Sequence, residues 1–235
     1  MEDIRARAER EAASLQSQLG ELLPFTGRLN STETVDYWIV QVPVGILFEV
    51  WRTQVQLPLA IRQENIQQLA FLCRNALELN IWAQYVVSTP EAAKRFHQDA
   101  YVDAIEVLKL MDKAFTHTPA ELHPVIKSQL DPLAPALERI LVRDKVGYSV
   151  AELRNMKHLQ VGAVAKEVGY APVYEMWNPV LSKLVHATAY NILVAGKDMD
   201  GVGIYLVERT AAELRSAVAS IDRYLDANKL PRYRA

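Results

Sequence analysis

The sequence predicts an all-α fold, in which a single domain of residues 1–235 contains about seven helices. Apolar residues recur at intervals of three and four along nearly every segment, as they do on the buried face of an amphipathic helix. Residues that typically cap helix N-termini precede several of these segments. No run alternates apolar and polar residues for long enough to predict a strand. Half of the residues are apolar, so the chain can bury a sizeable core.

The first helix is expected within residues 1–30, as an N-terminal arm or one side of a dimer seam. It stops at Pro24, which cannot continue the helical hydrogen bonds. Its apolar face consists of Ile4, Ala8, Ala12, Leu15, Leu19 and Leu22. We expect a homodimer, because a monomer would have to cover the seam of Ala8, Leu15, Leu19 and Leu22.

The next two segments are the most apolar. Pro43 interrupts the pattern of residues 35–57, and Pro58 predicts a bend or break after it. The most apolar window, residues 38–51, contains polar residues and is too short to cross a bilayer, so it is expected to be a core helix without membrane contact. Residues 60–87 are apolar almost all round, which predicts a central helix with Cys73 buried inside.

Capping patterns mark the later helices. The candidate caps are Thr89 before Pro90, Thr118 and Ser149 each with a glutamate three residues later, and Asp131 before Pro132. Gly169 is expected to end a helix. Residues 197–203 are expected to form a polar loop before a last amphipathic helix over residues 204–225, and the basic tail 229–235 is expected to fray.

Composition excludes several classes of function. The formal net charge of −2 provides no global field for nucleic acid or acidic lipid, so any RNA contact must be local, and DNA binding is not expected. The single cysteine cannot form an internal disulfide, and no secretory signal is visible, which favours the cytoplasm. The sequence contains no glycine-rich phosphate loop, zinc motif or nucleophile elbow, so no cofactor and no metal are expected.

Arg74 and Glu78 are the first candidate site residues. They lie one helical turn apart on a segment that otherwise looks buried, so both project from one face. They can be a structural ion pair that fixes the register of neighbouring helices. Alternatively, the carboxylate can hold the guanidinium in place for an anionic ligand.

A polar stripe is predicted along the segment YEMWNPVLSKLVHATAYN. Its members recur at every fourth position and are Tyr174, Asn178, Ser182, His186 and Tyr190. His186 can exchange a proton near neutral pH, and Pro179 predicts that the stripe bends. Because a charged pair on a buried helix needs polar partners, we expect Tyr174, Ser182 and His186 to face Arg74 and Glu78.

These two segments carry a resemblance that covers residues 60–193. CRNALELNIWAQYV contains an Arg-x-x-x-Glu helix, and the later segment contains the pattern Tyr-x6-Leu-Ser-x3-His with Tyr174, Leu181, Ser182 and His186. Together they resemble a family of uncharacterised bacterial helical proteins that is distantly similar to the HEPN superfamily. Many members of that superfamily are ribonucleases of toxin–antitoxin and antiviral systems.

The resemblance implies a HEPN-like helical bundle that pairs as a homodimer. HEPN ribonucleases typically carry an arginine and a histidine with four to six residues between them. Arg154 and His158 have only three residues between them, and they are secondary candidates on one helical face. The implied activity is metal-independent RNA cleavage, with His186 or His158 exchanging a proton and Arg74 or Arg154 stabilising the phosphorane.

Two functions therefore remain open. The first is a metal-independent endoribonuclease of a bacterial defence or toxin–antitoxin system, whose site consists of Tyr174, Arg74, Glu78, Ser182 and His186. The second is a non-catalytic helical binding module, such as a partner or immunity component of a defence or stress system, whose polar cluster is structural or binds a small anionic ligand. A protein from the same operon is a candidate partner of the chain. The near-neutral charge favours the second function, and the arginine–histidine–serine–tyrosine constellation favours the first.

Overall fold

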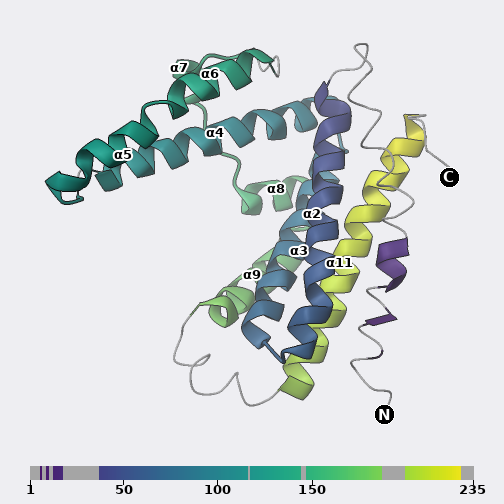
Figure 1. The fold of residues 1–235 in the computed structure, drawn as a ribbon. Helices are drawn as coiled ribbons and strands as arrows, with labels where there is room; N and C mark the ends of the chain where they lie inside the picture. The colour runs from purple at the N-terminus through teal and green to yellow at the C-terminus, as the bar shows by residue number, and fades with distance from the viewer. Residues whose placement is uncertain are drawn as a thin grey trace. The chain divides into compact units, whose positions relative to one another are not determined.

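The computed structural model describes residues 6, 9–10, 13–17, 37–115, 117–143, 147–186 and 199–228 (Figure 1). Over these ranges the chain is all-α without a strand, as the sequence predicts. Ten helical elements are described rather than about seven, because the segment between residues 115 and 171 is divided into several short helices. The chain forms two compact units, of which one contains residues 1–93 and 160–235 and the other contains residues 94–159. The expected single domain stays a prediction.

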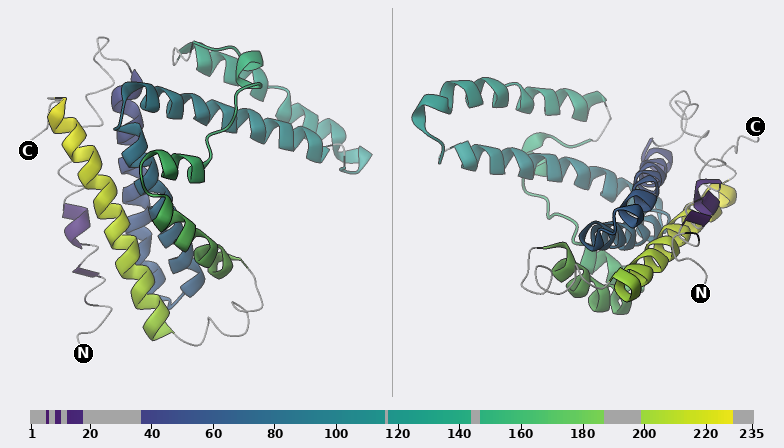
Figure 2. Two further views of the ribbon diagram at one scale, coloured as in Figure 1. Left: turned by 180° about the vertical axis from the view of Figure 1, so that it is seen from behind. Right: turned by 60° about the horizontal axis from the view of Figure 1, so that its bottom comes forward.

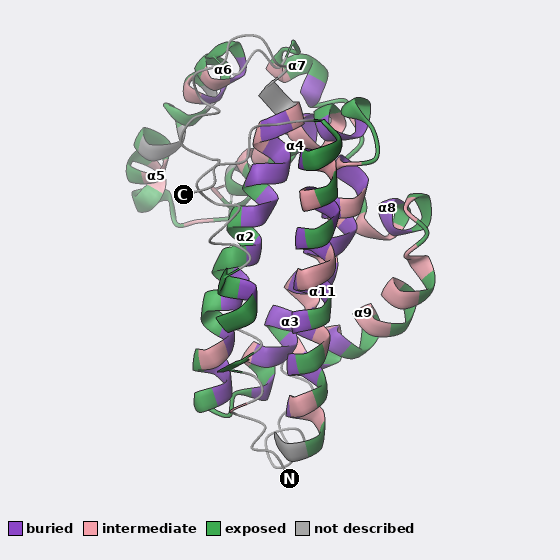
Figure 3. Cartoon of the chain, turned by 90° about the vertical axis from the view of Figure 1, so that its right-hand side faces the viewer, coloured by how far each residue is buried: buried purple, intermediate pink, exposed green. Residues whose placement is uncertain are grey.

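The first unit is built around helix α3 (Ile66–Val86). Helices α2 (Tyr37–Arg62), α8 (Val161–Glu167), α9 (Ala171–Val185) and α11 (Met199–Ala227) all pack against it, and α2, α3 and α11 lie side by side (Figures 1 and 2). Most residues of α3 are buried, which confirms the expected central helix (Figure 3). Cys73 is fully buried within it.

The boundary between α2 and α3 differs from the expected helix over residues 60–87. The helix is interrupted because Glu64 adopts a left-handed backbone with φ of 50°. Asn65 then caps α3, and its side chain accepts a hydrogen bond from the Gln68 amide at 2.9 Å. In contrast, α2 continues through both Pro43 and Pro58, so neither proline breaks it.

Two of the predicted helix caps, at Thr89 and Ser149, are confirmed, and the one at Thr118 is not. Thr89 accepts a hydrogen bond from the Ala92 amide at 3.0 Å and begins α4 (Pro90–Phe115), and Ser149 forms the reciprocal capping box with Glu152 at the start of α7 (Val150–Leu153). The predicted box at Thr118 is wrong, because its hydroxyl donates backward to the Phe115 carbonyl. The 3-10 helix η3 (Ala120–Leu122) that follows has no side-chain cap.

The second unit contains most of α4, then η3, α5 (His123–Leu130), α6 (Leu133–Arg143) and α7. A small core holds it together. Its buried members are Tyr101, Val102, Ile105, Leu137, Leu141 and Leu153.

Gly169 ends α8 as predicted. It has φ of 73°, and the following Tyr170 amide donates to the Ala165 carbonyl at 2.7 Å, the bonding pattern of a glycine-terminated helix. The polar loop expected over residues 197–203 is partly wrong, since α11 already begins at Met199. Most of the predicted first helix and the whole tail 229–235 lie outside the described residues. None of the helices described has both the length and the apolar character needed to cross a membrane.

Candidate functional site

Arg74 and Glu78 lie on α3 and face Ser182 on α9. Arg74 donates from Nε to Glu78 Oε1 at 3.0 Å and from Nη1 to Ser182 Oγ at 3.2 Å. The Arg74 and Glu78 side chains are 33% and 27% exposed, so solvent reaches this cluster. The carboxylate orients the guanidinium group, while part of the cation stays accessible to solvent and able to donate hydrogen bonds.

Tyr174 completes this cluster from the first half of α9. Burial raises the pKa of its phenol, and the Glu78 carboxylate raises it further, against the opposing effect of Arg74. Tyr174 therefore remains a protonated hydrogen-bond donor at neutral pH. The absence of a side chain at Gly162 on α8 leaves room for its ring, since a Cβ atom on that glycine would lie 3.3 Å from Tyr174 Cε1. We call Arg74, Glu78, Tyr174 and Ser182 the Arg74 cluster.

His186 lies just beyond the polar stripe of α9. Its backbone is extended, with ψ of 154°, so the helical stripe ends before it, and its amide donates to the Ser182 carbonyl at 3.1 Å. Gln67 on α3 donates to the neighbouring Val185 carbonyl at 2.6 Å and holds this end of α9. His186 is exposed, and the hydrogen bonds of Arg74 described above lead to Glu78 and Ser182. Tyr190 lies outside the described residues.

Arg154 and His158 do not share a helical face, contrary to the sequence-based expectation. Helix α7 ends at Leu153, Arg154 is its exposed C-cap, and residues 157–160 have no regular structure. A four-residue helix cannot carry a side-chain pair that begins after its end. His158 instead lies between two aspartates of α4, at 3.2 Å from Asp99 and 3.0 Å from Asp103.

A buried polar network that the sequence did not reveal connects α3 to α11. Asn80 donates to Glu213 Oε2 at 2.5 Å, and the Tyr170 hydroxyl lies 2.9 Å from both Glu213 oxygens. Arg209, one turn before Glu213, also bonds this carboxylate. The available signal was the repeated spacing Arg-x-x-x-Glu, which Arg209 and Glu213 share with the Arg74 pair. Gln84 extends the network by donating to Asn80 Oδ1 at 3.1 Å.

Cys73 borders this network and is chemically inert. Burial raises the pKa of its thiol to about 12, while a hydrogen bond with Thr210 lowers it in part. A thiol with such a pKa forms almost no thiolate at neutral pH, so Cys73 is not a nucleophile.

A groove of about 690 Å³ is lined by residues near the last turns of α3 and α11. Gln84, Glu167, Ser220 and Arg223 are among its lining residues, and Tyr224 is held there by a hydrogen bond to the Ile39 carbonyl at 3.2 Å. None of the residues of the Arg74 cluster lines it. Through Gln84 the groove adjoins the buried Asn80–Glu213 network.

The chain matches no protein-family model, no curated protein and no solved structure. The HEPN-like resemblance therefore depends on the residues of its two motifs.

Proposed function

We propose that this protein is a HEPN-like helical protein whose Arg74 cluster binds the phosphate of an RNA ligand. The observation that carries the proposal is the position of Arg74, whose guanidinium is fixed by Glu78 within one helix and by Ser182 from another. Such a preorganised, partly exposed guanidinium is suited to a phosphate oxygen. Tyr174 and Ser182 supply neutral hydroxyl donors beside it.

Local recognition of this kind is compatible with the charge of the chain. A net charge of −2 gives little long-range attraction to nucleic acid, so affinity has to come from a few fixed contacts. The nearby Glu78 carboxylate repels a bare anion but can accept a hydrogen bond from a ribose hydroxyl. This favours a phosphate attached to ribose over free inorganic phosphate.

Binding is tested by fluorescence anisotropy with a short single-stranded RNA. Arg74→Gln is expected to weaken binding at least about tenfold, because it removes a charge-assisted contact of about 1.5–3 kcal/mol. The matched control is Arg52→Gln, which removes the arginine of an exposed pair with Glu49 on the neighbouring helix α2. Equal effects of the two substitutions, or no measurable RNA binding by the unaltered chain, would refute the proposal.

Metal-independent RNA cleavage is the second candidate function. The observation that favours it is the exposed His186, which follows Ser182 by one turn and is available to solvent for proton exchange. His186→Ala is expected to abolish cleavage and to leave RNA affinity within about twofold, because a general acid or base contributes to the transition state and little to ground-state binding. Cleavage should persist in EDTA. Binding without cleavage would identify a non-catalytic module.

The cellular setting and the oligomeric state follow from the resemblance and stay proposals. A defence or toxin–antitoxin role predicts that expression is toxic and that a protein from the same operon relieves the toxicity.

A homodimer is also implied, although Leu15, one member of the predicted seam, is only 2% exposed within its own chain. An apolar stripe on α2 is more accessible and consists of Phe48, Trp51, Val55 and Leu59. Sedimentation that detects only the 26.5 kDa species at micromolar concentration would contradict the dimer.

A further inference from the structure

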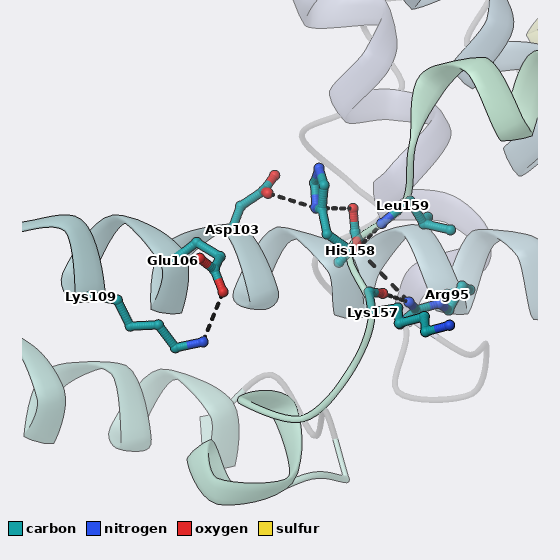
Figure 4. A network of polar contacts seen from close by, with 8 residues as sticks. Arg95, Asp103, Glu106, Lys109, Lys157, His158 and Leu159 are labelled. Atoms are coloured by element: carbon teal, nitrogen blue, oxygen red, sulfur yellow. Dashed lines mark hydrogen bonds and ion pairs between the residues drawn. The ribbon is translucent and has the colours of Figure 1, made fainter.

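Three potential metal ligands converge within residues 94–159, away from the Arg74 cluster in sequence. Asp99 and Asp103 lie one turn apart on α4, and His158 lies in the segment that follows α7. His158 Nδ1 is 3.2 Å from Asp99 Oδ2 and 3.0 Å from Asp103 Oδ1 (Figure 4). The three donor atoms all lie within 4.8 Å of one another.

We infer that Asp99, Asp103 and His158 form a binding site for a divalent transition-metal ion of the Zn²⁺ class. Zinc bonds to histidine nitrogen and carboxylate oxygen are about 2.0–2.2 Å long, so neighbouring ligands of a tetrahedral ion are about 3.3 Å apart. The separations of 3.0 and 3.2 Å approach this value. The nitrogen ligand distinguishes the site from calcium and magnesium sites, which consist of oxygen ligands.

The hydrogen-bonding capacity of His158 supports a bound ion over a simple hydrogen bond. Nδ1 carries at most one proton, yet it lies almost equally close to two carboxylate oxygens. One N–H group cannot be directed at both of them with good geometry. A cation between the three atoms would satisfy both oxygens and the nitrogen lone pair, and it would remove the repulsion between the two carboxylates.

Contacts around Asp99 orient its carboxylate toward this position. Asp99 is 5% exposed, and its Oδ1 accepts a hydrogen bond from the Leu159 amide at 2.8 Å. Arg95 lies 4.0 Å from the same oxygen and also donates to the Lys157 carbonyl. These contacts occupy Oδ1 and direct Oδ2 toward His158, as outer contacts do around metal ligands. Asp103 and His158 are 60% and 40% exposed, so an ion can enter from solvent.

The proposed ion would fasten residues 157–160 to α4. Two ligands come from the helix and one from the segment, so binding joins parts of the chain that are about 55 residues apart in sequence. Three protein ligands leave a fourth position of a tetrahedral ion for water or a ligand group. The site goes beyond the proposed RNA function, which concerns residues of the other unit and does not depend on a metal.

The test is calorimetric titration of the full chain with Zn²⁺, combined with Co²⁺ absorption spectroscopy. We expect one ion per chain and visible Co²⁺ bands typical of four ligands. Asp103→Asn and His158→Gln should each weaken binding at least about tenfold, because removing even an outer contact of a metal site costs 10–100-fold in affinity. Both residues are exposed, so circular dichroism should show unchanged helicity.

Two matched controls identify the site. Glu106→Gln removes an exposed carboxylate of the same helix that pairs with Lys109, and His117→Gln removes an exposed histidine of the same unit. Both variants should bind Zn²⁺ within about twofold of the unaltered chain. Equal affinity of Asp103→Asn and the unaltered chain, no stoichiometric Zn²⁺ binding, or tighter binding of Ca²⁺ than of Zn²⁺ would overturn the inference.

Discussion

Asn80 on α3 and Glu213 on α11 form a hydrogen bond of 2.5 Å at positions that are 0% and 1% exposed. Tyr170, at the start of α9, and Arg209 bond the same carboxylate, so residues of α3, α11 and the start of α9 meet at one buried acid. An ionised carboxylate is costly to bury unless its oxygens are hydrogen-bonded. We therefore expect Glu213 to fix how these helices pack.

Asn80→Ala should destabilise the protein by about 1–3 kcal/mol, because it removes a buried donor and leaves part of the Glu213 carboxylate unsatisfied. Urea unfolding followed by circular dichroism measures the change. The control is Gln63→Ala in the exposed turn between α2 and α3, which should change the free energy of unfolding by less than about 0.5 kcal/mol. A comparable effect of both substitutions would show that the network contributes little.

Tyr170→Phe should cost about 1 kcal/mol at pH 7 by removing one hydrogen bond to Glu213. Burial, and then the Glu213 charge, raise the pKa of Tyr170 to about 12 from its ordinary value of 10.0. Between these values the unfolded chain loses the phenolic proton and the folded chain keeps it, so the Tyr170 contribution to stability is present below pH 10 and is lost toward pH 12. The stability difference between the two proteins should therefore shrink from pH 10 to pH 12. A difference that is constant over this range would contradict the raised pKa.

The fold class was predictable because it depends on local patterns, whereas several boundaries were not. The hydroxyl of Thr89 caps α4 as its sequence predicts. Thr118 has the same kind of sequence, but its hydroxyl bonds backward to Phe115, and a sequence pattern cannot distinguish these two rotamers. The interruption at Glu64 depends on one left-handed residue, and such a conformation has no reliable signal when the residue is not glycine.

The sequence predicts contacts of the candidate site most directly where the two residues share a helix. Arg74 and Glu78 pair at the spacing of one turn, which the sequence displays directly. The contact between Arg74 and Ser182 joins residues 108 positions apart, and it was expected only because a buried charge requires a partner. Asn80 was missed because a lone amide on an apolar helix has no pattern that points to Glu213, which lies 133 positions later.

Cys73 should resist alkylation in the folded protein. Cys73 is 0% exposed, so the reagent cannot reach its thiol. Burial also raises the pKa of the thiol to about 12, so almost no reactive thiolate forms at pH 8. Iodoacetamide followed by mass spectrometry should show almost no labelling in buffer and complete labelling in urea. Rapid labelling in buffer would indicate that α3 is not buried as described.

The capping box of α7 should be visible in the titration of Glu152. Hydrogen bonds from the Ser149 amide and hydroxyl lower the pKa of Glu152 below its ordinary value of 4.5. Because the folded pKa is the lower one, the contribution of the box to stability is present above pH 4.5 and is lost as the pH falls through the folded value. NMR titration of Ser149→Ala should show the Glu152 pKa moving upward toward 4.5. An unchanged pKa would mean that the box does not form in solution.

Gly162→Ala should weaken ligand binding by the Arg74 cluster, because it displaces the Tyr174 ring, and it should leave the stability of the fold nearly unchanged. The added methyl group would lie 3.3 Å from the Tyr174 ring, so the ring must shift by a few tenths of an ångström. Alanine also favours the helix by up to about 1 kcal/mol relative to glycine, so the two effects on stability should nearly cancel. The control is Gly45→Ala in α2, where the methyl group meets no atom within 4 Å and should only stabilise.

Fluorescence anisotropy of bound RNA then shows whether Tyr174 supports binding through its hydroxyl group or through the packing of its ring. If Tyr174 donates to the ligand, Tyr174→Phe should weaken binding by about fivefold, the equivalent of one hydrogen bond of about 1 kcal/mol. Gly162→Ala should weaken binding in the same direction by a smaller factor, because it displaces the hydroxyl without removing it, and Gly45→Ala should leave binding unchanged. A loss in Gly162→Ala without a loss in Tyr174→Phe would show that the ring, and not its hydroxyl, supports the site, since only the hydroxyl differs between tyrosine and phenylalanine.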